Sequence, residues 1–166
     1  LCYVAYKSVC DKLGVDSNVK ITSVLIDVPV SRGLGSSATL IVAGAVGANK
    51  LHGNRLTEDE IFRICTEIEG HPDNIAPAIF GGLCASVVAD SIPFTVKYPV
   101  SDNVHFTAVV PNFEVLTKEA RALIPSMVRR EDAIFNMSRA AVLPRAFEKG
   151  DFELIKLSTQ DRLHER

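Results

Sequence analysis

Glycine and serine residues gather in one short stretch of the sequence, Pro-Val-Ser-Arg-Gly-Leu-Gly-Ser-Ser-Ala at residues 29–38. Gly33 and Gly35 allow the backbone to approach a ligand closely. The predicted helix that follows offers unpaired N–H groups and the positive end of its dipole to an anion. The hydroxyls of Ser36 and Ser37 can reach a phosphate group or a magnesium ion. These residues in this order predict a phosphate-binding loop.

Other interpretations of the same stretch stay open. It is not a Walker A loop, because no Gly-Lys-Ser/Thr follows. Gly33, Gly35 and Ala38 satisfy the G-x-G-x-x-A pattern of dinucleotide-binding folds, which requires a second strand ending in an acidic residue about 20 positions later. At that place, Leu51 to Asp59, the sequence predicts a loop and a helix start. A tight turn that binds no ligand is the remaining interpretation.

A second group of polar residues runs from Glu67 to Asn74. Glu67 and Glu69 fall in the last turn of a predicted helix, where negative charge opposes the helix dipole by ~0.3–1 kcal/mol. His71-Pro-Asp-Asn follows directly as a turn. Spacing alone favours two solvated carboxylates for the glutamates. For the turn, it favours a helix capped by Asp73 or Asn74, with His71 as an ordinary loop histidine.

Thr117 and Arg121 form a third candidate, because residues four positions apart share one face of a helix. A threonine helix cap and a solvated arginine would account for this spacing. The planar guanidinium of arginine also suits a bidentate contact with a carboxylate.

Hydrophobic spacing predicts the elements that position these residues, and together they indicate an α+β fold. The predicted helices cover residues 1–13, 36–51, 58–69, 75–80, 117–123, 131–149 with an interruption at Pro144, and 152–163. The predicted strands cover residues 19–28, 83–89, 94–98 and 105–110. A capping box from Thr57 to Glu60 opens the third helix. Gly44 and Gly47 suggest that the second helix packs closely against a sheet.

Composition sets further bounds. The chain has 166 residues, 47% of them hydrophobic and 23% charged, which is enough for a core and fits one domain or one and a half. The net charge of −2 gives no basic excess for nucleic acid, and no apolar stretch approaches the ~20 residues of a membrane span. We expect the four cysteines to be buried or partly buried thiols in a reducing compartment. We also expect both ends to be cut, since the sequence begins at Leu1 within a helix.

The motifs resemble those of a known family. Residues 29–38 look like the phosphate loop of the GHMP kinases, which phosphorylate small molecules with ATP and magnesium. Residues 69–82, Glu-Gly-His-Pro-Asp-Asn-Ile-Ala-Pro-Ala-Ile-Phe-Gly-Gly, are similar to the homoserine kinase version of the second GHMP motif. Residues 113–121 resemble the third motif. Asn-Met-Ser-Arg-Ala at 136–140 and Asp-Arg-Leu-His-Glu at 161–165 also look like homoserine kinase blocks.

The resemblance implies two domains and a reaction. Residues 1–100 would form the ATP-binding GHMP N-terminal domain, which resembles the second domain of a ribosomal small-subunit protein and is incomplete at its start. Residues 101–166 would begin a ferredoxin-like C-terminal domain that is incomplete at its end. The implied reaction converts L-homoserine and ATP to O-phospho-L-homoserine and ADP in threonine biosynthesis. A GHMP kinase for another small hydroxyl substrate and a catalytically incompetent, nucleotide-binding fragment are the alternatives.

The implied partners are the small molecules ATP and L-homoserine with Mg²⁺, and neither nucleic acid nor a membrane; a homodimer is left open. The location would be the cytoplasm, or the plastid in a plant. The implied ATP-binding residues are Pro29, Arg32, Gly33, Leu34, Gly35, Ser36, Ser37 and Ala38.

Metal and substrate roles follow from the same resemblance. Ser37 and Glu69 would hold Mg²⁺, and Glu69, Asn74 and Arg121 would be the catalytic residues. The implied substrate-binding residues are His71, Asp73, Asn74, Thr117 and Arg121. In relatives such as mevalonate kinase, an aspartate proposed as the base stands where Asn74 stands here. The usual base is therefore absent unless Asp73 substitutes for it.

Overall fold

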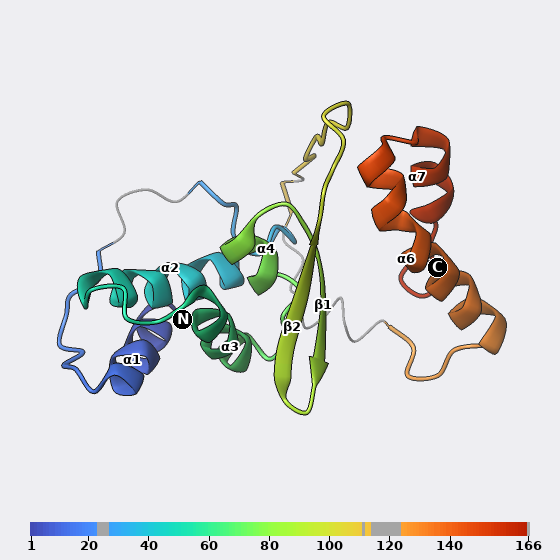
Figure 1. Ribbon diagram of the computed structural model, residues 1–166. Helices are drawn as coiled ribbons and strands as arrows, with labels where there is room; N and C mark the ends of the chain where they lie inside the picture. Colours follow the sequence, from blue (N-terminus) through green and yellow to red (C-terminus); the bar gives the residue numbers. More distant parts are fainter. Residues whose placement is uncertain (23–26, 111, 114–123, 166) are drawn as a thin grey trace. The chain divides into compact units, whose positions relative to one another are not determined.

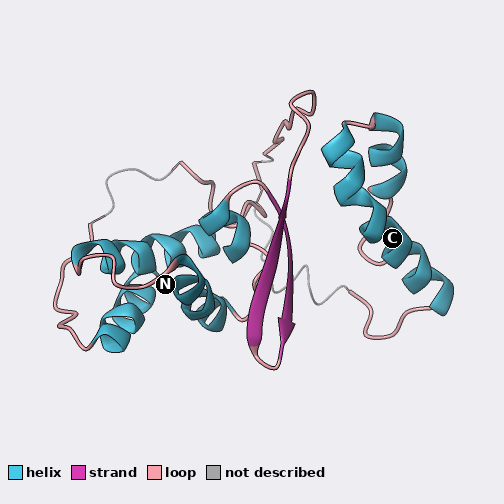
Figure 2. Cartoon of the chain, viewed as in Figure 1, coloured by secondary structure: helices cyan, strands magenta, loops and turns pink. Residues whose placement is uncertain are grey.

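The computed structural model describes residues 1–22, 27–110, 112–113 and 124–165, and the chain divides into two compact units, Leu1–Lys97 and Tyr98–Arg166 (Figure 1). The first unit contains α1 (Cys2–Leu13), α2 (Ser36–Leu51), α3 (Glu58–Glu69), α4 (Ile75–Phe80), β1 (Leu83–Ala89) and β2 (Ile92–Tyr98). The second contains α6 (Arg130–Lys149) and α7 (Phe152–Ser158). Helices and a two-stranded sheet confirm the α+β class (Figure 2). The domain boundary at residues 100 and 101 stays a prediction.

The α3 helix is positioned by local sequence signals at both of its ends. The Thr57 hydroxyl accepts the N–H of Glu60, and the Glu60 carboxylate accepts the N–H of Thr57 at 2.9 Å, so the predicted capping box forms. These bonds from Thr57 hold the pKa of Glu60 below its usual value. Gly70 ends the helix in the left-handed conformation at φ +89°, where glycine carries no steric penalty.

The core of the first unit lies between α1, α2, α3 and α4. Side chains from all four helices are fully buried there, including Val9, Ile41, Cys65 and Ile75 at 0% exposure. Burying each large aliphatic side chain contributes ~1.5–3 kcal/mol. This core fixes the ends of α2, α3 and α4, which carry the candidate site residues.

The two glycines inside α2, Gly44 and Gly47, were predicted to pack against a sheet, and their surroundings differ from that prediction. A Cβ atom on Gly44 would lie 2.0 Å from the backbone oxygen of Cys2, so Gly44 allows α1 to cross α2 closely. A Cβ atom on Gly47 would meet nothing within 4 Å. The prediction that these glycines pack against a sheet is therefore wrong, because the neighbour of Gly44 is a helix and Gly47 has none among the described residues.

Two of the four predicted strands form. Residues 83–89 match β1, and β2 begins two residues before the predicted 94–98. Residues 19–22, 27–28 and 105–110 are irregular, so the strands predicted at 19–28 and 105–110 are wrong in their described parts. A strand is stable only when neighbouring strands receive its backbone hydrogen bonds, and the described sheet consists of β1 and β2 alone.

The helices of the second unit differ from prediction in two ways. The α6 helix continues through Pro144, where an interruption was expected. The α7 helix ends at Ser158 and not at Leu163, because the backbone N–H groups of Leu163 and His164 turn toward the carboxylate of Asp161. The helix predicted at residues 117–123 lies outside the described residues.

The cysteines are free thiols, as predicted: Cys10 and Cys65 are buried, and Cys2 and Cys84 are partly buried. Burial raises the pKa of Cys65 to about 12, which leaves its thiol unreactive at neutral pH. Among the helices in the described ranges, none is both long and apolar enough to cross a membrane.

Candidate functional site

The glycine-rich loop leads directly into the first turn of α2. Gly33 and Gly35 have φ values of +73° and +71°, in the left-handed region that favours glycine. Gly35 is the residue before the helix begins, and Ser36, Ser37 and Ala38 form the first turn. That turn contains no acidic residue, so its dipole and N–H groups present positive potential to an anion.

Ser37 and Glu69 lie in direct contact, although 32 positions separate them in the sequence. The Ser37 hydroxyl donates a hydrogen bond of 2.7 Å to Glu69 Oε2. Glu69 is the last residue of α3, where its charge is unfavourable, but it reaches the N-terminal turn of α2, where negative charge is favourable. A hydroxyl and a carboxylate side by side are the oxygen ligands that Mg²⁺ prefers, so this pair suits the metal implied by the sequence motifs.

The neighbouring acidic residue faces elsewhere. Glu67 is exposed and lines a hollow together with Lys12, Arg63 and Ser91. The structure therefore separates two carboxylates that the sequence placed in the same helical turn, and only Glu69 contacts the loop.

The turn after α3 is held by Asp73. Its Oδ1 atom shares a hydrogen bond with His71 Nδ1 and accepts the backbone N–H of Asn74 at 2.8 Å. The Asn74 side chain makes no capping bond to α4. Its Oδ1 atom lies 3.5 Å from the place of a Cβ atom on Gly35, so the amide rests against the last glycine of the loop. Sequence spacing gave no sign of this contact, because the two residues lie on different elements.

The other loop residues that the resemblance names are exposed or only partly buried. The Arg32 guanidinium donates to the backbone oxygens of Val30 and Ser31 at 3.2 and 3.3 Å. Pro29 is exposed, and Leu34 is 44% exposed. Thr117 and Arg121 lie outside the described residues, so their predicted roles stay predictions.

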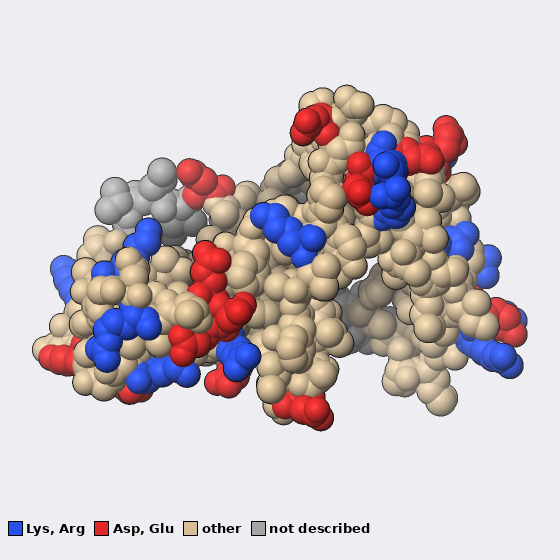
Figure 3. Space-filling view, in the orientation of Figure 1, with Lys and Arg blue, Asp and Glu red and all other residues tan. Residues whose placement is uncertain are grey.

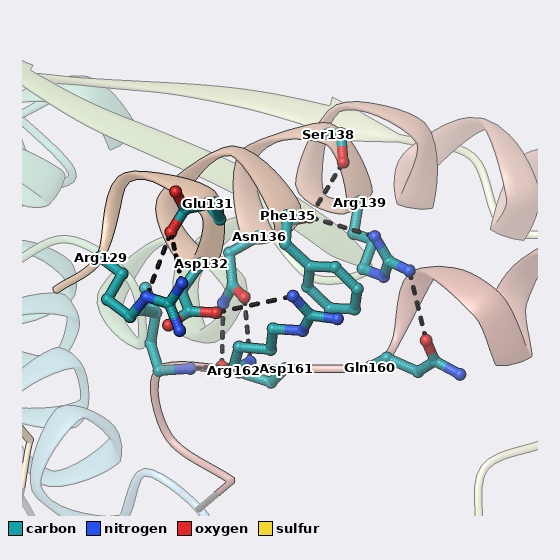
Figure 4. A network of polar contacts seen from close by, with 11 residues as sticks. Arg129, Glu131, Asp132, Phe135, Asn136, Ser138, Arg139, Gln160, Asp161 and Arg162 are labelled. Atoms are coloured by element: carbon teal, nitrogen blue, oxygen red, sulfur yellow. Dashed lines mark hydrogen bonds and ion pairs between the residues drawn. The ribbon is translucent and has the colours of Figure 1, made fainter.

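The two further sequence blocks meet within the second unit (Figure 4). The Asn136 side chain donates to Asp161 Oδ1 at 2.9 Å and accepts the N–H of Arg162 at 3.0 Å. Asp161 also accepts from the backbone of Leu163 and His164 and contacts His164 Nδ1. The Asn136 amide, followed by these N–H groups, holds the pKa of Asp161 well below its usual range.

The same network contains an aromatic ring with two cations. The guanidinium carbon of Arg139 lies 3.2 Å from the Phe135 ring centroid, and that of Arg162 lies 3.8 Å from it (Figure 4). Arg139 also donates to Gln160 at 3.3 Å. These contacts tie the segment after α7 to α6.

Charge is mixed over the face of the molecule that Figure 3 shows. On the face in Figure 3, acidic and basic side chains are interspersed, in keeping with a net charge of −2. Within the described parts of the chain, no three His, Cys, Asp or Glu side chains gather as a metal site. The metal ligands that the sequence motifs imply are Ser37 and Glu69, which contribute one hydroxyl and one carboxylate.

Comparison with known proteins gives a family match for the first half of the chain. Residues 1–82 match the family model described as the GHMP kinases N terminal domain. These residues hold the loop, α3 and the turn described above.

The most informative matches are homoserine kinases. The chain is 39% identical over 166 residues to homoserine kinase of Clostridium beijerinckii and 42% identical over 165 residues to that of Clostridium botulinum strain ATCC 19397. Each match covers 99% of this chain and 56% of the relative, so the chain spans about half the length of these proteins.

Solved structures agree with the sequence matches. The crystal structure of homoserine kinase from Cytophaga hutchinsonii has a TM-score of 0.79 at 26% identity, covering 98% of this chain and 53% of that one. A putative homoserine kinase from Listeria monocytogenes has a TM-score of 0.64 at 32% identity, covering 82% and 46% respectively. The predicted resemblance to the homoserine kinases is thereby confirmed.

Proposed function

We propose that this protein takes part in the ATP-dependent phosphorylation of the hydroxyl group of L-homoserine. The products would be O-phospho-L-homoserine and ADP, in threonine biosynthesis. The observation that carries this proposal is the 2.7 Å hydrogen bond between Ser37 and Glu69. It joins the phosphate loop to the second motif and supports a pair of oxygen ligands for Mg²⁺, the ion that such phosphoryl transfers use.

The loop supplies the nucleotide site in this proposal. Backbone N–H groups from Gly33 to Ala38, with the hydroxyl of Ser36, would bind the phosphates of ATP. Pro29, Arg32 and Leu34 would flank the nucleotide. Ser37 and Glu69 would hold Mg²⁺, which when bound neutralises charge on the phosphate oxygens.

The turn after α3 supplies part of the substrate site. Asn74 lies against Gly35 and so would meet the substrate hydroxyl beside the phosphates. An amide cannot accept a proton at neutral pH, so Asn74 would position the hydroxyl. Asp73 is already bonded to His71 and to the Asn74 N–H, which favours a structural role for it over that of a base. Thr117 and Arg121 would bind the homoserine carboxylate.

Positioning and charge neutralisation can account for such a reaction. Phosphoryl transfer has a loose transition state and needs little covalent help from the protein. Correct orientation alone can contribute ~7–11 kcal/mol to lowering a barrier. A site without a general base is therefore chemically sufficient.

The test is substrate-dependent ADP release by the complete gene product with ATP and Mg²⁺. We expect turnover with L-homoserine and none with mevalonate or galactose. Turnover with another hydroxyl compound alone would replace the substrate but keep the class of enzyme. ADP binding by titration with no turnover of any of the three would instead indicate a nucleotide-binding protein without kinase activity.

A variant of the loop tests the nucleotide site separately. Gly35→Val introduces a branched side chain at φ +71°, where it also meets the Asn74 amide, so ADP affinity should fall at least tenfold. Gly14→Val is the matched control, because Gly14 has a φ of +66° with nothing within 4 Å of its Cβ position. Equal ADP affinity in the two folded variants would contradict the assignment of the loop.

A further inference from the structure

The short helix α4 connects the substrate turn to the hairpin, and its position requires tertiary support. It has six residues, far fewer than the ~12–15 that an isolated helix needs in water. Asn74 lies immediately before it, so any movement of α4 moves the Asn74 amide relative to Gly35. The contacts that hold α4 therefore decide where Asn74 lies.

Two sets of apolar contacts hold α4 against the core of the first unit. Ile75 and Ala76, in the first turn of α4, are both fully buried. Phe80, at the end of α4, packs edge-on against Phe62 of α3 with ring centroids 5.4 Å apart. These contacts fix one face of α4 but leave the carbonyl groups at its C-terminal end to be satisfied.

The third contact is polar and comes from the hairpin. Lys97, in β2, donates from Nζ to the backbone oxygen of Phe80 at 2.7 Å. A cation at this place also faces the negative end of the helix dipole. In Figure 1, α4 lies between α2 and the two strands, and it packs against β1, the neighbour of β2 in the hairpin.

The local backbone leaves room for this lysine. Gly81 and Gly82 follow α4 with φ values of +68° and +73°. A Cβ atom on Gly82 would lie 3.0 Å from Lys97 Cε and 3.8 Å from Nζ, so the lysine side chain crosses directly over Gly82. The absence of a side chain at this position is what lets the ammonium group reach Phe80.

From this geometry we infer that Lys97 is a positioning residue, which fixes α4 from the hairpin and thereby holds Asn74 against the glycine loop. The inference rests on the proposed function for its kinetic consequence, because Asn74 is there assigned to the substrate hydroxyl. Lys97 itself would touch neither nucleotide nor homoserine. The motifs of the sequence give it no role, since the contact joins residues 17 positions apart on two different elements.

The first experiment measures the position of α4 without reference to activity. Lys97→Met keeps an unbranched chain of similar length and removes the donor and the charge. Amide hydrogen exchange should speed up at Ala78 and Gly81, whose N–H groups bond to Asn74 and Pro77, by roughly three- to tenfold. Lys50→Met, which removes a lysine from the last turn of α2, is the matched control and should leave α4 unchanged. Unchanged exchange at α4 in Lys97→Met would overturn the inference.

The second experiment uses homoserine-dependent ADP release. Lys97→Met should raise the KM for homoserine roughly five- to tenfold and leave the KM for ATP within twofold, because the lysine holds the substrate turn and not the loop. Lys97→Arg, which keeps the donor and the charge, should recover part of the loss. If Lys97→Met instead raised the KM for ATP as much as that for homoserine, the loss would be one of general folding, and the positioning role would be refuted.

A double variant decides whether Lys97 acts through Asn74. If it does, Asn74→Ala with Lys97→Met should be about as impaired as Asn74→Ala alone, because non-additivity is the mark of residues that act as a unit. Fully additive losses would overturn the inference. Absence of any homoserine turnover in the unaltered protein would refute the proposed function instead, and the exchange experiment would still decide the positioning of α4.

Discussion

The crossing of α1 and α2 gives a sharp test of how the first unit is held together. In Gly44→Ala, the new Cβ would lie 2.0 Å from the Cys2 oxygen and 2.9 Å from the Cys2 carbonyl carbon, where real Cβ contacts are essentially never under 3.0 Å. The backbone of α1 at Cys2 and that of α2 at Gly44 must therefore move apart by about 1.0 Å. The obstacle is backbone, so no side-chain rotation can relieve it.

The cost of this separation follows from the buried contacts on either side. Val9 of α1 and Ile41 of α2 are fully buried in the core. A radial gap of ~0.5–1 Å forfeits a quarter to a half of each dispersion contact, and overpacking of this kind costs ~1–3 kcal/mol. Alanine recovers at most ~1 kcal/mol through its higher helix propensity. Because the obstacle is backbone, we take the upper end of that cost, ~3 kcal/mol, and expect Gly44→Ala to lower the free energy of unfolding by about 2 kcal/mol.

Gly47→Ala is the control within the same helix. It has the same propensity gain and nothing within 4 Å, so it should raise the free energy of unfolding by ~0.5–1 kcal/mol. Urea unfolding followed by circular dichroism would measure both variants, and the separation between them should be about 3 kcal/mol. If Gly44→Ala were as stable as Gly47→Ala, the close approach of α1 to α2 would be refuted.

Three further predictions concern single side chains. Glu69→Gln should lower homoserine-dependent turnover by roughly 100-fold and raise the Mg²⁺ requirement. Glu67→Gln, which faces away from the loop, should stay within twofold; equal losses would exclude the metal assignment. Asn74→Asp should bring no gain in turnover and no new acidic limb in the pH–rate profile, because a loose phosphoryl transfer needs little proton abstraction; a gain of tenfold or more would show that a base is useful here. Asp161→Asn should lower the unfolding free energy at pH 7, and the difference from the unaltered protein should shrink as the pH falls below 3.8, the ordinary value, since a lowered folded-state pKa stabilises only while the carboxylate is ionised; urea unfolding from pH 7 to pH 3 would show it, and a constant difference would contradict it.

Local signals account for the parts of the fold that the sequence predicts well. The α2 helix spans residues 36–51 as predicted, and α3 begins at its capping box and ends at Gly70. These features depend on residues within four positions of each other. The described parts of the strands predicted at 19–28 and 105–110 are irregular for the opposite reason. A strand requires hydrogen-bonding partners elsewhere in the chain, which local β-propensity cannot supply.

The end of α7 shows a tertiary contact overriding a local pattern. Apolar spacing continues to Leu163, yet the helix stops at Ser158. The Asp161 carboxylate accepts a hydrogen bond of 2.9 Å from the Asn136 side-chain amide. It also accepts the backbone N–H groups of Leu163 and His164, which therefore cannot continue the helix. Asn136 lies 25 positions away from Asp161, beyond the reach of periodicity.

Beside the glycine-rich loop, two glutamates at the end of α3 break a local rule in the sequence. A glutamate in the last turn of a helix opposes the dipole, and nothing within α3 compensates Glu69, since its last turn contains no basic residue. The structure resolves the conflict at a distance, through Ser37 in the first turn of α2. Residues that disagree with their own element and agree with a distant one are expected at functional sites. Glu67, two positions earlier, breaks the same rule without such a partner, so the rule can indicate a site but cannot choose between the two glutamates. That choice needs the fold, which brings the beginning of α2 to the end of α3 and turns Glu69, and not Glu67, toward the loop.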